Sequence, residues 1–316
     1  MALPIHLRDA HWESLHPPLL ETGTYAVDPV PYGPPWRPWE EAGPQAVAAQ
    51  GFFVPPGSLS EGPSGTVLLA PGDLRGTGLI AGRTGGYCLG INGGDGPNLA
   101  CLDCAAPVGS RIDDCGAWQM VRLLPQAVAE LPGPPERPVM DWAELPADGV
   151  LRHRLSAYLD IPAGAALAHV VVSSGGGPVE VTPGPIAELL GRALTTLLPS
   201  GKDAKRLDLA GPGLGQTTAG LVLVPVHPQT GEVWQPGGGA VGVPVEAALW
   251  AELAFPAHRT RLPVVGGLPE GVERDDPLPP HPNGPFRPSL TAFRRTLART
   301  PVVREPWLRA IYDRGY

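Results

Sequence analysis

All four cysteines of this chain lie between residues 88 and 115, in the pattern C-x12-C-x2-C-x10-C. Thiolates are preferred ligands of zinc and iron, and the C-x-x-C pair Cys101 and Cys104 can present two of them from one tight turn. Flanking strands can bring Cys88 and Cys115 to the same ion. Four thiolates at about 2.3 Å form a closed tetrahedral zinc site, and such a site contributes directly to folding. The spacing therefore predicts a structural zinc site with these four cysteines as ligands.

In these features the window resembles a zinc ribbon or zinc knuckle. Glycines at positions 90, 93, 94, 96 and 109 suit a backbone that bends closely around an ion. The resemblance covers residues 78–120. It departs from the usual arrangement of two C-x-x-C pairs, because only Cys101 and Cys104 are spaced in that way.

Other chemistry is compatible with the same cysteines. Iron suits four thiolates as well as zinc does, and four unligated buried thiols are a further alternative. Two disulfides need an oxidising compartment, and a thioredoxin-type redox pair needs a helix after it, which "CAAPVGSRIDD" does not predict. A catalytic zinc keeps a position open for water, and four cysteines would fill it. A nucleobase deaminase also needs a glutamate two residues after its first ligand, where this chain has Gly90.

Composition restricts the class of protein. Glycine and proline number 42 each among 316 residues, but 43% of the chain is hydrophobic, so we expect a folded protein with long proline-stiffened connections. The net charge of -8 and the lack of a basic stripe argue against a nucleic-acid partner. No run approaches 18 apolar residues and the N-terminus has no signal-peptide pattern. We therefore expect no membrane partner and a cytoplasmic location, where thiols stay reduced.

The patterns predict an α/β (α+β) chain in four parts. Residues 1–50 form a proline- and tryptophan-rich arm, 51–145 a β-rich metal-binding domain, 146–265 an α/β domain, and 266–316 a proline-rich segment with C-terminal helices. The runs "GTVLLAPG", "GTGLIAG", "LAHVVVSSGGG", "KRLDLAG" and "TAGLVLVPV" predict strands, and "GLIAGRTGGYCLGI" predicts a hairpin. Apolar spacing predicts helices in "PIAELLGRALTTLL" and "VEAALWAELAF", and Ser289 is the expected N-cap of another.

The remaining motifs name no reaction. The chain has no G-x-S-x-G and no H-E-x-x-H, and the glycine-rich "SSGGG" and "GPGLG" match no nucleotide-binding fingerprint and predict turns. We therefore expect a non-enzymatic accessory or protein-interaction protein, whose proline-rich segments pack on the chain itself or bind protein partners. The oligomeric state stays open. The alternatives are an enzyme with dispersed site residues in 148–265 and an iron-thiolate redox protein.

Overall fold

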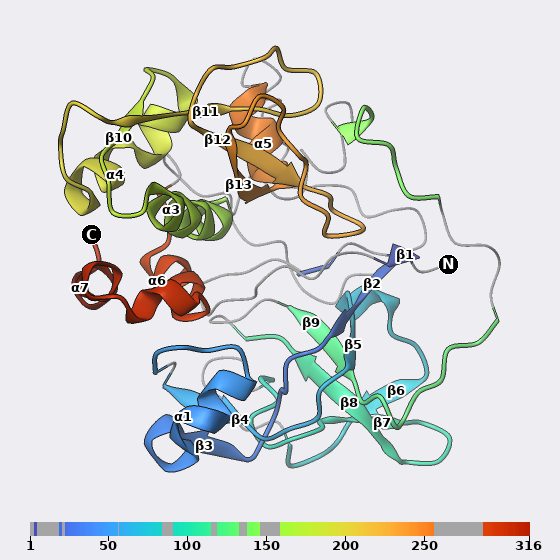
Figure 1. The fold of residues 1–316 in the computed structure, drawn as a ribbon. Helices are drawn as coiled ribbons and strands as arrows, with labels where there is room; N and C mark the ends of the chain where they lie inside the picture. Colours follow the sequence, from blue (N-terminus) through green and yellow to red (C-terminus); the bar gives the residue numbers. More distant parts are fainter. Residues whose placement is uncertain are drawn as a thin grey trace. The chain divides into compact units, whose positions relative to one another are not determined.

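The computed structural model describes residues 3–4, 19–20, 23–55, 57–83, 91–114, 119–132, 138–145, 159–255 and 287–316. They form two compact units (Figure 1). Unit 1 contains the described residues within 1–50 and 57–138, and unit 2 those within 51–55, 139–255 and 287–316. An antiparallel sheet, a parallel sheet and six described helices confirm the prediction of a mixed α/β chain. No described helix has both the length and the apolar character that crossing a bilayer requires.

Unit 1 is built on one sheet with the strand order β1-β2-β5-β9-β8-β7-β6. The β1–β2 pair is parallel and the other pairs are antiparallel. Its strands are β1 (Leu3–Pro4), β2 (Thr24–Asp28), β5 (Thr66–Leu69), β6 (Thr77–Leu79), β7 (Leu99–Cys101), β8 (Pro107–Ile112) and β9 (Met120–Leu123). A 3-10 turn, η1 (Pro71–Asp73), follows β5.

Local sequence explains several of these strands. The predicted runs "GTVLLAPG" and "GTGLIAG" are confirmed as β5 and β6. Gly109 of β8 lies opposite Leu123 of β9, and a Cβ atom at Gly109 would lie 2.3 Å from the Arg122 carbonyl oxygen. Only glycine therefore lets β8 pair with β9 this closely. The predicted hairpin turn at Gly85 and Gly86 lies outside the described residues.

The region predicted as an extended arm contributes regular elements to unit 1. Besides β2, it forms β3 (Trp36–Pro38), which pairs with β4 (Ser58–Ser60), and the helix α1 (Trp39–Ala49). Gly43 interrupts α1 with a φ of 78°, directly before Pro44. Trp36 is 46% exposed, so packing within unit 1 leaves much of this side chain uncovered.

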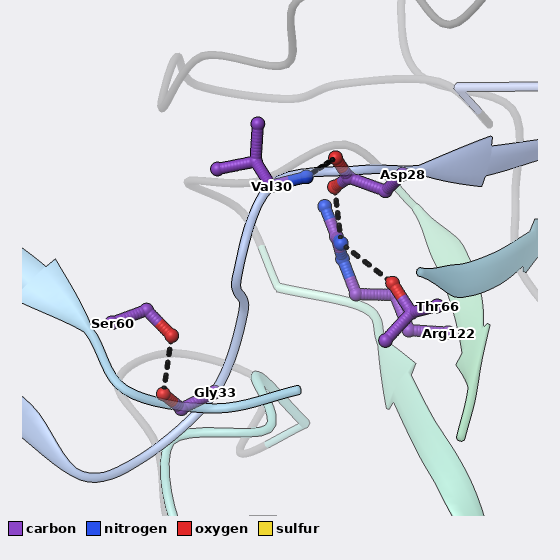
Figure 2. A network of polar contacts seen from close by, with 6 residues as sticks. All are labelled: Asp28, Val30, Gly33, Ser60, Thr66 and Arg122. Atoms are coloured by element: carbon purple, nitrogen blue, oxygen red, sulfur yellow. Dashed lines mark hydrogen bonds and ion pairs between the residues drawn. The ribbon is translucent and has the colours of Figure 1, made fainter. Parts of the chain in front are cut away.

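A buried ion pair ties three neighbouring strands of the sheet together (Figure 2). Arg122 of β9 donates to Asp28 of β2 at 2.6 Å and to Thr66 of β5 at 3.3 Å. Both charged side chains are only 8% exposed, and the guanidinium lies 3.8 Å from the ring centroid of Tyr32. Burial in this environment raises the pKa of the Tyr32 hydroxyl. The second oxygen of Asp28 accepts from the Val30 amide at 2.9 Å, so the carboxylate is held on both sides.

Unit 2 is built on a four-stranded parallel sheet with the order β10-β11-β12-β13. The predicted strands "KRLDLAG" and "TAGLVLVPV" and the predicted helices within 185–198 and 245–255 are confirmed. Its elements before the C-terminal helices are α3 (Asp160–Ser174), β10 (Val179–Val181), the π-turn η4 (Ala187–Gly191), α4 (Arg192–Leu197), β11 (Lys205–Leu209), β12 (Leu221–Val226), β13 (Val241–Glu246) and α5 (Ala247–Ala254).

The strand predicted for "LAHVVVSSGGG" is wrong, because these residues end the helix α3. The β-branched run 170–172 favours a strand locally, but the apolar stretch begins at Ile161 and is longer than a typical strand. Gly175 ends the helix in a left-handed conformation with a φ of 66°. α3 contacts β13 and β12 as well as the C-terminal helix α6, so it is buried around most of its circumference.

The C-terminal helices complete unit 2. They are α6 (Leu290–Ala298), η6 (Pro301–Arg304) and α7 (Pro306–Arg314). The predicted N-cap is confirmed, since the Ser289 hydroxyl accepts from the Ala292 amide. Residues 51–55 belong to this unit, because the Phe53 amide donates to Ala298 at 2.7 Å and Arg304 donates to the Phe53 carbonyl. The part of the predicted proline-rich segment before residue 287 lies outside the described residues.

The buried ion pair predicts a large difference between two arginine substitutions. Arg122→Met leaves the buried Asp28 carboxylate without its guanidinium partner. We therefore expect the free energy of unfolding, measured in urea, to fall by about 3–5 kcal/mol. Arg309→Met removes an exposed ion pair with Asp313 and should lower the free energy of unfolding by at most about 1 kcal/mol. Equal losses in the two variants would contradict the structural role of the buried pair.

The contact between α3 and α6 predicts a second pair of variants. A Cβ atom at Gly164 would lie 2.3 Å from the Ser289 carbonyl oxygen, so Gly164→Ala should destabilise the protein by about 1–3 kcal/mol. Gly191 is helical, and its Cβ atom would lie no closer than 3.8 Å to another group. Gly191→Ala should therefore be neutral or stabilise by up to about 1 kcal/mol. Thermal unfolding of both variants measures these changes in stability. A Gly164→Ala protein as stable as the parent would refute the close packing.

Candidate metal centre

Cys101 and Cys104 lie at the turn that joins β7 to β8. Cys101 is the last residue of β7 and pairs with Thr77 of the neighbouring strand β6. The register between β7 and β8 shifts at Leu99 and Ala100, directly before the turn. Residues 102–106 then reverse the chain into β8. Two strands therefore fix the position of the first cysteine, and the turn itself positions the second.

Backbone hydrogen bonds hold the turn closed. The Cys101 amide donates to Ala106 at 2.9 Å, and the Ala105 amide donates to the Cys101 carbonyl at 2.9 Å. The Leu102 amide donates to Gly76 at 3.0 Å, which ties the turn to the residue before β6. Ala105 has a φ of 58°, a left-handed conformation that is unfavourable for a residue with a side chain. The turn thus holds the two cysteines together at a local conformational cost.

Groups in the turn lower the pKa of the Cys101 thiol. Hydrogen bonding from the backbone of Cys104 and of Asp103, and then from the Cys104 thiol, favours the thiolate, whereas desolvation and the charge of Asp103 oppose it. Cys101 is half-buried and Cys104 is exposed. Amide donors directed at one sulfur favour its thiolate form, which is the form that binds a metal. We call residues 101–105 the knuckle.

The knuckle provides two of the four ligands predicted from the sequence. Cys88 and Cys115 lie outside the described residues, so their part of the four-cysteine assignment stays a prediction. Within the described ranges, no three His, Cys, Asp or Glu side chains gather in a way that could hold an ion. Two adjacent thiols with a stabilised thiolate fit zinc or iron, and they need further ligands to complete a tetrahedral shell.

The far end of β8 is polar and buried. The Asn98 side chain makes two hydrogen bonds to the backbone of Arg111. It accepts from the Arg111 amide at 2.7 Å and donates to the Arg111 carbonyl at 2.9 Å. Arg111 pairs with Asp113 at 2.9 Å, and Asp113 forms a backbone bridge with Ile91. Asp113 and Asp114 follow β8, which separates both from the knuckle. Sequence reasoning missed Asn98, because no local motif marks a side chain that pairs across strands.

Unit 2 has one histidine at the end of a parallel strand, where ligands often bind. His227 follows β12 and is buried, with Nε2 at 3.1 Å from the Met140 carbonyl. Its Nδ1 accepts from the amides of Gln229 and Thr230, so both ring nitrogens are engaged. The hydrogen bonds give this histidine a structural role in shaping the turn after β12.

An open depression of about 580 Å³ lies beside His227. Its lining consists of Trp142, Glu232, Val233, Trp234 and Gln235. The Trp142 ring meets the His227 ring edge-on, with centroids 4.9 Å apart. Glu232 is the one carboxylate of this lining, and both ring nitrogens of the neighbouring His227 are already hydrogen-bonded to the backbone. The depression therefore resembles an aromatic contact surface more than a paired acid and base.

The two glycine-rich loops of unit 2 form turns, as predicted. Gly175 of "SSGGG" ends α3, and Gly176 packs under Trp307, where a Cβ atom would lie 3.1 Å from the ring. Gly211 of "GPGLG" packs on Trp250, whose indole donates to the Ala210 carbonyl at 3.0 Å. These glycines are explained by close packing against two indole rings.

The strained turn predicts a stabilising substitution. Glycine adopts a φ of 58° without the steric cost that alanine bears, so Ala105→Gly should raise the free energy of unfolding by about 1 kcal/mol. Ala105→Val should lower it, because a β-branched side chain is worse in this conformation. Urea unfolding of both variants tests this. A Gly variant less stable than the parent would show that Ala105 does not adopt the left-handed conformation.

Comparisons with protein families, with curated proteins and with solved structures give no match for this chain.

Proposed function

We propose that this protein is a non-enzymatic accessory protein whose unit 1 carries a structural zinc site on the knuckle. The observation that supports the proposal best is the closed turn between β7 and β8, in which backbone hydrogen bonds hold Cys101 and Cys104 with two residues between them. A C-x-x-C pair in a tight turn can present two thiolates to one ion, and the thiolate is the form that binds the metal. The Ala105 conformation is a further sign that the turn is shaped around the two sulfurs.

Each residue of the knuckle has a separate task in this proposal. Cys101 and Cys104 bind the ion, the amides of Asp103 and Cys104 orient the first sulfur, and the turn at Ala105 keeps both sulfurs on one side. Zinc supplies a fixed tetrahedral link between chain segments, which stabilises the folded state because the unfolded chain does not hold the ligands together. The sequence assigns Cys88 and Cys115 as the remaining ligands, and iron suits the same donors.

We place the protein in the cytoplasm, where the exposed thiol of Cys104 stays reduced and available to a metal. Its interaction role is supported by apolar side chains that unit 1 exposes. Trp36, Val27 and Leu102 are among them, in two different parts of that unit. Single exposed apolar residues are common in any protein, so the proposal gives weight to Leu102, which lies inside the knuckle.

Metal analysis of the purified full chain tests the proposal. We expect about 0.5–1 equivalent of zinc per chain, and a lower melting temperature after chelation because the ion stabilises only the folded state. Cys101→Ser should weaken binding by more than the 10–100-fold that loss of an outer-shell partner costs, or roughly 100-fold and above. Asp103→Asn is the matched control, since it keeps the turn and both thiols and should retain the metal.

The same preparation distinguishes the alternatives. Iron at the knuckle would give the pure protein a visible colour, which zinc does not. Less than about 0.3 equivalents of either metal, with both knuckle thiols freely reactive toward an alkylating reagent, would refute the metal site.

A further inference from the structure

We propose that the knuckle binds its zinc ion together with the knuckle of a second copy of this chain. One ion would then be held by four thiolates, Cys101 and Cys104 from each copy. This inference rests on the metal site proposed above, and it replaces Cys88 and Cys115 as the remaining ligands with Cys101 and Cys104 of the second copy. It depends on three features of unit 1: the length of β8, the exposure of the turn, and the position of β6 at the edge of the sheet.

The first feature is the distance that β8 imposes. Ala106 accepts the hydrogen bond from the Cys101 amide and therefore marks the knuckle end of the strand. From Ala106 to Asp113 the chain advances seven residues, six of which form β8. At about 3.3 Å per residue, the two ends lie about 23 Å apart. Ile91 is at the far end as well, because it pairs with Asp113.

The length of the chain then limits where the other two cysteines can bind. Cys115 follows Asp113 by two residues and Cys88 precedes Ile91 by three. Fully extended, these stretches cover at most about 7 Å and 11 Å. Two cysteines on one zinc ion have Cα atoms within about 10 Å of each other, given Zn–S bonds of about 2.3 Å. The two ends of β8 are about 23 Å apart, so neither stretch is long enough to bring its cysteine within about 10 Å of the knuckle cysteines. The described backbone therefore favours ligands from another source.

The second feature is that the knuckle faces solvent. Cys104 is exposed and Leu102, between the two cysteines, is 70% exposed. A structural zinc inside one chain is normally enclosed by its own four ligands, whereas this pair of sulfurs is presented at the outer side of a turn. Within unit 1, a thiol and an apolar side chain of the knuckle are therefore open to solvent.

The third feature is the sheet edge beside the turn. β6 is the last strand of the described sheet, and its Leu79 is 48% exposed. Leu102 lies over Gly78 of the same strand, where a Cβ atom would come within 3.1 Å of its side chain. An exposed edge strand and two exposed leucines provide an apolar contact area next to the sulfurs. A two-fold axis through the ion would bring the same area of both copies together and complete a tetrahedral shell with two thiolates from each.

Zinc titration of the full chain, followed by sedimentation velocity in the presence of a non-thiol reductant, tests the shared site. We expect a monomer after chelation, a dimer after zinc is added back, and saturation at about 0.5 zinc per chain. Cobalt should give a thiolate-to-metal absorption band that saturates at the same ratio. Cys101→Ser and Cys104→Ser should abolish the band and the dimer. Cys88→Ser and Cys115→Ser are the matched controls and should keep both.

The outcomes separate this inference from the proposed function. A monomer that binds one zinc per chain and loses it in Cys88→Ser or Cys115→Ser overturns the shared site but leaves the structural zinc site standing. A dimer that persists in chelator and reductant overturns the zinc bridge. Failure to bind zinc, iron or cobalt overturns both proposals.

Discussion

The pairing of β8 with β9 is the constraint on which unit 1 depends. Gly109 allows this pairing because its missing side chain leaves room for the Arg122 carbonyl, 2.3 Å from where a Cβ atom would be. The side chain of the same arginine reaches the other way, to Asp28 and Thr66 (Figure 2). One residue therefore sets the contact between β8 and β9 through its backbone and joins β9 to β5 and β2 through its guanidinium. A change in this register would move every residue of β8 to the opposite face.

The two ends of β8 differ in how their polar groups are bonded and exposed. At the far end, Asn98, Arg111 and Asp113 satisfy one another in a buried setting, as polar groups removed from water must. At the knuckle end, hydrogen bonding from the turn lowers the pKa of the Cys101 thiol, and Cys104 stays exposed. The two ends therefore differ in exposure and in chemistry. The knuckle end presents a thiol to solvent, and its thiolate form is the one that binds a metal.

The sequence predicted those features that a few neighbouring residues determine. Ser289 caps α6 because the cap involves only the next three residues, and the turn that contains Cys101 and Cys104 is closed by hydrogen bonds between residues 101 and 106. It failed for α3, where the valine run 170–172 favoured a strand although burial between a sheet and another helix favours a helix. It also gave no sign that residues 51–55 pack with the C-terminal helices, because such contacts join segments more than 200 residues apart. The assignment of all four cysteines to one ion stays a prediction, because Cys88 and Cys115 lie outside the described residues.

The source of the ligands also determines what kind of stabilisation zinc can give. An ion held by one chain stabilises that chain to an extent set by the zinc concentration and the affinity alone. An ion shared by two knuckles links folding, metal binding and association, so its effect rises with protein concentration as well. An exposed thiol such as that of Cys104 is also open to oxidation when no ion covers it, whereas a bound metal occupies the thiolate. A shared site would therefore make assembly of this protein depend on both the metal supply and the redox state of its surroundings.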